Sequence, residues 1–147
     1  MFDWLRRLFA SEEIPIPDPV DDPRLGRLVY HPDSDEWVGS FEYAGAPVEI
    51  SLYGSLTEPD PEEAEHCARV IEAFDEVWEQ AEELIRTQGP KFKAGDPDEF
   101  RPSSVCNFYQ KERKTYFMMF LEREDDPYRL WRMEYVDWKA TDLGFDS

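Results

Sequence analysis

The sequence predicts an α+β domain in which an antiparallel sheet of five to six strands packs on one long helix, with a short amphipathic helix ahead of it. Three observations support this fold class. Apolar and polar residues alternate between residues 25 and 53, apolar residues recur every three or four positions between residues 60 and 88, and strand-like runs return after residue 102. The 147 residues match one ordinary domain, and a 15% share of aromatic residues provides enough large apolar surface for a core.

Residues 1–13 are predicted to hold the short amphipathic helix. Asp3 can cap it, and Trp4 and Leu8 fall on its apolar face. A helix of about ten residues is too short to be stable alone, so it needs its own domain, a second copy of the chain or a membrane surface to pack on. We favour protein, because a membrane anchor requires a longer basic face or a second signal. Residues 14–24 contain four prolines, which predict an extended linker before a single domain at residues 25–147.

Three strand-like runs with a period of two follow the linker. They are LGRLVY, EWVGSFEY and PVEISLY, separated by the turn formers HPDSD and AGA. In the third run Val48, Ile50 and Leu52 share one face, opposite Glu49 and Ser51. The alternation predicts a meander with one buried face, and the short connections predict antiparallel neighbours.

Residues 60–88 are predicted to form the long helix. Asp60 stands at the N-cap, Pro61 at the first helical position and Glu63 at the third, as in a capping box, and Gly89 with Pro90 supplies the stop. At 1.5 Å per residue this helix would run on the order of 40 Å, long enough to cross the sheet. Its apolar stripe consists of Ala64, Cys67, Ala68, Ile71, Phe74, Val77, Trp78, Ala81, Leu84 and Ile85.

A second β region follows a Gly/Pro/Asp loop at residues 91–102. SVCNFY and TYFMMFLE flank the polar QKERK and predict a hairpin, and LWRMEYVDW follows the turn EDDPYR. Because TYFMMFLE is apolar on both faces, it predicts a central strand. We expect the long helix to cover one face, and the N-terminal segment or a partner to cover the other.

The formal net charge of −18 is concentrated in the first two-thirds of the chain. Residues 1–100 carry 25 acids and 8 bases, whereas residues 101–147 carry 9 acids and 8 bases. Such a field repels nucleic-acid phosphates and anionic membranes and attracts basic proteins, so we expect a basic protein partner and no nucleic acid. No apolar run is long enough to span a bilayer, and the first residues lack a secretory signal, so we also expect a cytoplasmic protein without a membrane span.

No catalytic or ligand motif stands out, so we assign no catalytic residue, metal site or cofactor. Cys67 and Cys106 lie in apolar contexts without CxxC spacing, which predicts reduced core residues. His66 lies beside Cys67, but adjacent helical positions point about 100° apart, which excludes a dyad between the two. Phosphate-binding loops, zinc-protease and esterase motifs and EF-hand loops are all missing from the sequence.

Acidic residues dominate the outer face of the long helix, since residues 60–90 contain ten acids and only two bases. Like charges three and four positions apart cost on the order of 1–3 kcal/mol together at low salt, and Glu and Lys have similar helix propensities. Helix formation therefore does not explain the missing bases. We predict that this face, named the acidic ridge, binds a partner through Glu65, Glu72, Asp75, Glu76, Glu79 and Glu83.

The acidic ridge has three interpretations: a solvated face in a protein from a high-salt habitat, an interface for a basic protein, and mimicry of nucleic acid. Mimicry fits least, because the ridge offers one acid per ~4 Å of axis, against one charge per ~1.7 Å in a DNA duplex. Two other functions stay open. One is a small enzyme with a dispersed site assembled from Tyr30, His31, Asp35 and Cys106, and the other is a structural protein that self-associates through its N-terminal helix.

The order GRLVY, EWVGSFEY, PVEISLY, one long helix, TYFMMFLE and DDPYRLWRMEYVDW resembles small uncharacterised bacterial α+β families. The similarity covers about residues 25–143 and rests on aromatic and glycine positions in the strands. Some members of those families are thought to be immunity proteins of toxin systems. The resemblance implies an α+β architecture and a binding role, and it supplies no catalytic residues. We therefore predict a non-enzymatic acidic protein-binding module, of the immunity or inhibitor kind, that covers a basic partner.

Overall fold

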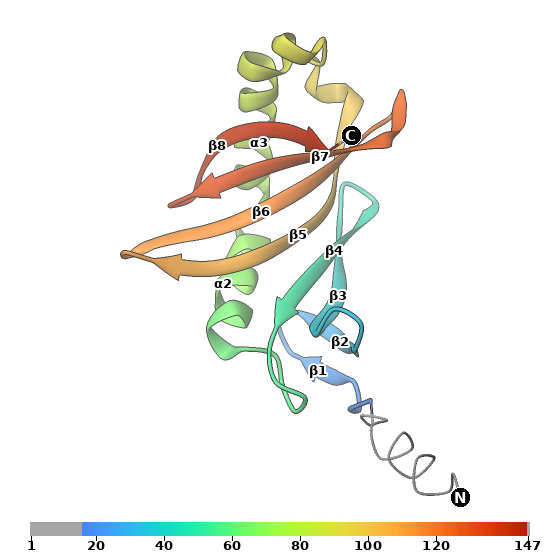
Figure 1. The fold of residues 1–147 in the computed structure, drawn as a ribbon, viewed down its shortest axis with the longest axis vertical. Coiled ribbons are helices and arrows are strands. Elements are labelled where there is room, and N and C mark those ends of the chain that lie inside the picture. Colours follow the sequence, from blue (N-terminus) through green and yellow to red (C-terminus); the bar gives the residue numbers. More distant parts are fainter. Residues whose placement is uncertain (1–15, 147) are drawn as a thin grey trace, which may run out of the picture.

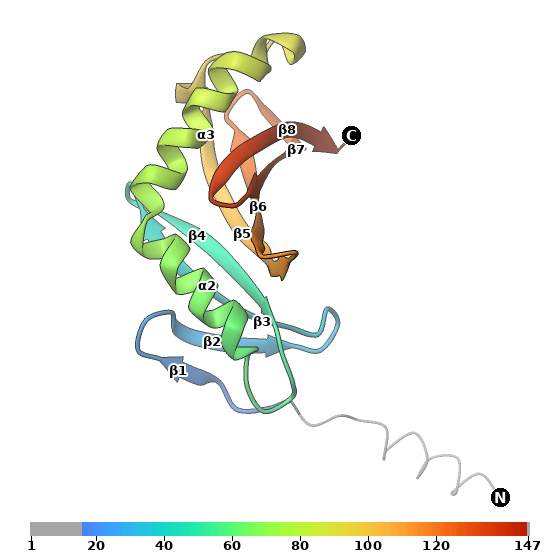
Figure 2. The ribbon, with the colours of Figure 1, turned by 90° about the vertical axis from the view of Figure 1, so that its left-hand side faces the viewer.

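The computed structural model describes residues 16–146, whose strands form one eight-stranded sheet in sequence order. The strands are β1 (Val20–Asp22), β2 (Gly26–His31), β3 (Glu36–Tyr43), β4 (Ala46–Tyr53), β5 (Phe100–Lys111), β6 (Lys114–Arg123), β7 (Asp126–Val136) and β8 (Lys139–Asp146). Neighbours are antiparallel except β4 and β5, which are parallel. The helices α2 (Pro61–Glu72) and α3 (Phe74–Gln88) connect these two strands and lie along one face of the sheet, as Figures 1 and 2 show.

Tight turns build the two antiparallel meanders on either side of the parallel pair. In the second meander, Glu112 and Arg113 both have positive φ, and so do Asp137 and Trp138. Two successive residues with positive φ form the turn whose twist suits a two-residue hairpin. Short antiparallel hairpins therefore join β5 to β6 and β7 to β8.

The predicted alternation places the core where expected in the first meander, whereas β6, predicted to be covered on both faces, buries only one of them. Val48, Ile50 and Leu52 of β4 are fully buried, which confirms the predicted buried face of that strand. In the second meander Met119 and Trp131 are likewise fully buried. Both sets contribute to one hydrophobic core that the helices cover.

The predicted ends of the helical region are confirmed. The Asp60 side chain accepts a hydrogen bond of 3.0 Å from the Glu63 N–H, which satisfies one free donor of the first turn. Gly89 ends α3 where the chain folds back on itself. A Cβ at this position would lie 2.1 Å from the carbonyl oxygen of Ala94, so only glycine fits this close backbone approach.

The predicted fold class is wrong in the number of strands. The sheet has eight strands rather than five to six, because β1 and β8 were not recognised. Val20–Asp22 stands among the prolines assigned to the linker, yet it pairs with residues 26–28. The β8 sequence KATDLGFD does not alternate regularly, and only Leu143 is fully buried in its burial pattern. Pairing with a neighbouring strand, rather than an amphipathic pattern, defines both elements.

The single long helix and the purely antiparallel sheet are wrong as well. The helix breaks at Ala73, whose φ of −101° and ψ of 19° are not helical. Figure 2 shows that the helical region changes direction there as it follows a strongly twisted sheet. Since the two helices return the chain to the end of the sheet where β4 began, β5 runs parallel to β4.

The predicted N-terminal amphipathic helix at residues 1–13 lies outside the described residues. In the part of the chain from residue 16 to residue 146, no helix combines the length and apolar character needed to cross a membrane.

Candidate functional site

The acidic ridge lies where it was predicted, on the outer side of α2 and α3. All six of its residues are exposed. Two of them are tied to the turn between β1 and β2, because the Arg24 guanidinium pairs with Glu65 and, at 3.4 Å, with Glu72. This arginine lowers the pKa of the Glu65 carboxyl. Part of the ridge is thus neutralised within the protein.

The middle of the acidic ridge carries charge that the described protein does not compensate. Glu83 lies 3.5 Å from Arg86 one turn further along α3. In contrast, Asp75, Glu76 and Glu79 have no lysine or arginine within ion-pair distance among residues 16–146. We refer to these three residues as the uncompensated segment.

A shallow depression of about 440 Å³ adjoins the uncompensated segment. Glu76 borders it, and the half-buried indole of Trp138 lines it, with the Arg69 guanidinium 5.0 Å from the ring centroid. Aromatic rings in depressions rimmed by charge are typical anchor points of protein interfaces. The ridge therefore offers an apolar contact as well as charge.

The residues of the alternative, dispersed enzyme site do not all come together in the described part of the chain. The Tyr30 hydroxyl donates a hydrogen bond of 2.5 Å to Asp35, and this bond raises the pKa of Tyr30. His31 is exposed on β2, whereas Cys106 lies on β5, with β3 and β4 between them in the sheet. Burial raises the pKa of the Cys106 thiol to about 11, so it stays protonated at neutral pH and is not activated as a nucleophile.

A second candidate site, which the sequence did not reveal, lies where β4 and β5 separate. The two strands pair only at Glu49 with Ser104 and Ile50 with Val105. Beyond these pairs β5 contains an irregularity, where Asn107 adopts a φ of 57°. Figure 1 shows the strands spreading apart towards their carboxyl ends, with α2 behind the gap. Crevices outside the carboxyl ends of parallel strands are a preferred place for ligands in α/β sheets.

The gap holds a crevice of about 450 Å³, which is within the range of small-ligand sites. The rings of Tyr109 and Tyr116 stack on one side of it, 4.8 Å apart and nearly parallel. We call this cavity the crevice. It is lined by Tyr53, Glu63, Asn107, Phe108, Tyr109, Tyr116, Phe117, Met118, Glu134, Tyr135 and Val136.

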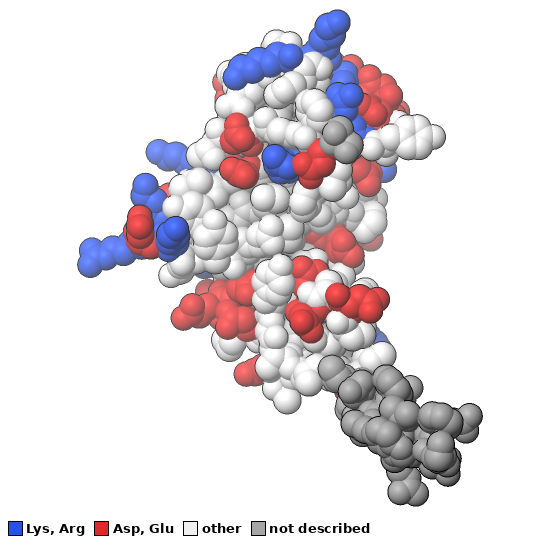
Figure 3. Space-filling model, viewed as in Figure 1, with Lys and Arg blue, Asp and Glu red and all other residues white. Residues whose placement is uncertain are grey.

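The crevice opens on the face of the sheet that the helices do not cover. Phe117 contacts His66 of α2, and the Tyr135 hydroxyl donates to the Val77 carbonyl of α3 at 2.7 Å, so both side chains point towards the helices. Their neighbours along the strands, including Tyr116 and Glu134, therefore point away from the helices. Figure 3 shows this open face, with acidic side chains gathered over its lower half and basic ones towards the rim.

Glu63 is the less exposed of the two charged residues that line the crevice. Glu63 occupies the third position of α2. Its Oε1 accepts a hydrogen bond of 3.3 Å from the Tyr53 N–H, whereas the Asp60 N–H donates to the Tyr53 carbonyl oxygen, so only half of the predicted capping box forms. Burial, together with the nearby carboxylates of Asp60 and Glu36, raises the pKa of Glu63 to about 7 despite its hydrogen bond to Tyr53. No lysine or arginine of the described residues forms an ion pair with it. The carboxyl is therefore about half ionised at neutral pH.

His66 lies one position off the predicted apolar stripe but is only 6% exposed. Its ring packs against Phe108, Phe117 and Trp138, and its Nε2 has no hydrogen-bond partner in the described structure. Burial, with a smaller contribution from Arg69, lowers its pKa, so the ring is neutral at pH 7. It lines a smaller cavity of about 230 Å³, to which Glu63 also contributes.

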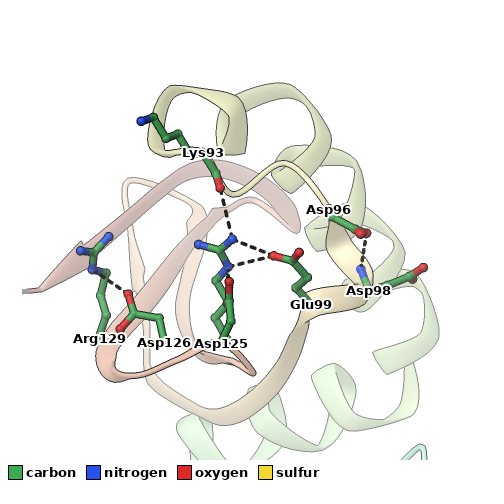
Figure 4. Close-up of polar contacts among 8 residues, drawn as sticks. Lys93, Asp96, Asp98, Glu99, Asp125, Asp126 and Arg129 are labelled. Carbon is green, nitrogen blue, oxygen red and sulfur yellow. Dashed lines mark hydrogen bonds and ion pairs between the residues drawn. The ribbon is translucent and has the colours of Figure 1, made fainter.

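A fourth cavity, of about 570 Å³, lies beside a group of closely paired charges and is a weaker candidate site. Figure 4 shows Glu99, Asp125 and the Lys93 carbonyl converging on one guanidinium group, that of Arg123. Its distances to the two carboxylates are 2.7 Å and 2.8 Å. Since these charges satisfy each other, they hold the loop before β5 in place and leave little for a ligand.

Among residues 16–146, no three His, Cys, Asp or Glu side chains gather as a metal centre would require. Comparison of the chain with protein-family models, with curated proteins and with solved structures gives no match. The resemblance to small bacterial α+β families therefore stays an expectation. The residues that form the crevice were visible in the sequence as a glutamate at the third position of a predicted helix and three tyrosines near strand ends. The sequence did not show that these residues lie together in space.

Proposed function

We propose that this chain is a non-enzymatic protein-binding module whose acidic ridge covers a basic partner. The uncompensated segment carries this proposal, because Asp75, Glu76 and Glu79 lie exposed on adjacent turns of α3 and one of them, Glu76, borders the depression lined by Trp138. A partner that presents lysines or arginines would relieve the repulsion among these acids and bury the indole. An immunity or inhibitor protein is the form of this function that we favour.

Electrostatics predict how such a partner would bind. A surface of one charge sign accelerates encounter with a partner of opposite sign, and salt weakens this effect by screening. Association should therefore slow steeply as the salt concentration rises, while dissociation should depend mainly on the contacts of the depression.

The test compares two triple variants of equal net charge. In the first, D75N/E76Q/E79Q, the uncompensated segment is neutral. In the control, D33N/E42Q/D142N, three exposed acids on other elements are neutral. Each protein is used to capture partners from the native host, and the association rate of every captured basic protein is then measured between 50 and 500 mM salt.

We expect the ridge variant to lower the association rate constant at low salt at least tenfold and to flatten its salt dependence. The control should change the rate less than threefold. Capture of the same partners, with unchanged association rates, by the ridge variant would contradict the proposed function.

A further inference from the structure

The crevice combines the chemical features that recognise an organic cation. Tyr53, Tyr109 and Tyr116 contribute aromatic rings, whose faces carry partial negative charge and attract cations. Glu63 contributes a carboxyl that has no cationic partner among the described residues. A carboxyl in this position disfavours an anionic ligand.

We propose that the crevice binds a ligand through an ammonium or guanidinium group, held between the Glu63 carboxylate and the tyrosine rings. This inference goes beyond the proposed function, because the crevice opens on the uncovered face of the sheet, whereas the acidic ridge lies on the outer side of the helices. The cation can belong to a free amine or to a lysine or arginine side chain of a polypeptide.

The charged groups near Glu63 that act on it or line the same cavity are acidic, so they attract a cation to this position. Glu36 on β3 and Asp60 at the helix cap are acidic and act on it directly. Glu134 on β7 lines the same cavity, and His66 on α2 is neutral at pH 7. The residues that β4 and β5 contribute to the crevice are uncharged. They are Tyr53 on β4 and Asn107, Phe108 and Tyr109 on β5.

The base nearest to Glu63 in the sequence is Arg69 on α2, which lies over the Trp138 ring and does not line the crevice. The next bases to consider belong to the hairpin tip between β5 and β6. Lys111, Arg113 and Lys114 are exposed there, beyond the stacked pair of Tyr109 and Tyr116, and none of the three lines the crevice. They therefore leave the Glu63 carboxylate available to a ligand.

Binding of a cation should be coupled to the ionisation of Glu63. A cation favours the carboxylate, so a protein that binds it below pH 7 must release a proton. The pKa of Glu63, raised to about 7 by burial, places this change near neutral pH. Affinity should therefore rise about tenfold between pH 6 and pH 8 and level off above that range.

Calorimetric titrations of the full chain test the proposal with two cationic probes, n-butylammonium and Nα-acetyl-lysine methylamide. The uncharged Nα-acetyl-norleucine methylamide serves as their control. Titrations at pH 6, 7 and 8 in phosphate and in MOPS report proton release, since the two buffers differ in ionisation enthalpy and neither carries a net positive charge that would compete with the probes. Equal affinity for both cations points to a free amine, whereas preference for the lysine derivative points to a polypeptide side chain.

Three substitutions locate the binding. Glu63→Gln keeps an oxygen for the Tyr53 N–H, and should weaken cation binding at least tenfold at pH 8 and remove its pH dependence. Tyr109→Leu should weaken it about fivefold. Glu76→Gln, which changes the net charge equally but lies in the acidic ridge, should change it less than twofold. If the acidic ridge turned out not to bind a basic partner, the cation affinities of the crevice would be unaffected, so each proposal can be refuted without refuting the other.

The proposal is overturned if neither cation binds at 10 mM, if the norleucine derivative binds as well as the lysine derivative, or if Glu63→Gln binds like the wild type. A second measurement does not depend on any variant. The carboxyl carbon of Glu63, followed by NMR through a pH titration, should show a lower pKa when a saturating cationic probe is present, and an unchanged pKa would also overturn the proposal.

Discussion

Glu63 couples its ionisation to folding, since its carboxyl is half-buried at the edge of β4. Its pKa of about 7 lies above the value of 4.5 expected in an unfolded chain, so the folded state binds more protons between these two values. The free energy of unfolding should therefore fall as the pH rises from about 4.5 to 7. Because the side chain is partly exposed, solvent screening reduces this loss to on the order of 1–2 kcal/mol.

We expect Glu63→Gln to abolish this loss, which urea unfolding between pH 5 and pH 8 would measure. His66 acts in the opposite direction, because its lowered pKa removes stability as the pH falls below about 6.5. The slopes of unfolding free energy against pH are therefore compared above that pH. Glu76→Gln is the matched control and should keep the wild-type slope. An equal slope in Glu63→Gln would show that another group is responsible.

At the scale of elements, the break between α2 and α3 serves the packing of the first residue of α3. The Phe74 ring is 2% exposed and meets Phe41 and Tyr43 edge to face, with ring centroids 5.0 Å and 4.7 Å away. These contacts join the helical layer to β3 at the point where the chain changes direction. They add to the stabilisation that burial alone provides.

Phe74→Ala should therefore cost about 3–5 kcal/mol of unfolding free energy, because a large cavity would remain between the helix and β3. Phe120→Ala is the matched control, since Phe120 is only half-buried on the open face of β6, and it should cost less than half as much. Chemical denaturation of both variants checks this. Equal losses would contradict a special contribution of Phe74 to the packing of α3 on β3.

At the scale of the whole molecule, the net charge of −18 destabilises the compact state by self-repulsion. The uncompensated segment concentrates part of this repulsion, whereas Glu65 and Glu72 are relieved by Arg24. The Debye length falls to about 10 Å at 0.1 M salt, which screens repulsion between the more distant charges. Stability should therefore depend on salt.

We expect the melting temperature to rise when NaCl increases from 20 to 300 mM, and E76K/E79K to raise it by ~2–4 °C at the lower concentration. The variant should also respond less to salt. The control D33K/D142K changes the net charge equally but lies outside the ridge, so its gain should be smaller. Thermal melts that show no difference between the two variants would contradict a special strain in the ridge.

How far the sequence predicts the fold depends on how local each cause is. The N-cap at Asp60 and the stop at Gly89 are local, and they were predicted correctly, whereas the Glu63 carboxyl bonds to the Tyr53 N–H and does not close the predicted capping box. The buried face of β4 follows from simple alternation and was predicted as well. In contrast, β1 and β8 have no clear pattern of their own, and hydrogen bonds to a neighbouring strand create them. No Gly or Pro marks the break at Ala73 in the sequence. The next residue, Phe74, packs against aromatic rings of β3 that are distant in the chain, and a local pattern does not reveal such contacts.

The sequence by itself determined the buried face of β4, the two ends of the helical region and the excess of acids on its outer side, since each depends on residues that are close in the chain. Only the tertiary structure decided that β5 runs parallel to β4, that the two strands separate, and that Glu63 lies in the resulting crevice. The physical reason is that burial and the charges acting on a side chain come from segments far apart in sequence. The same glutamate reads as a helix cap locally and becomes a titrating group only once β3, β4 and β5 surround it.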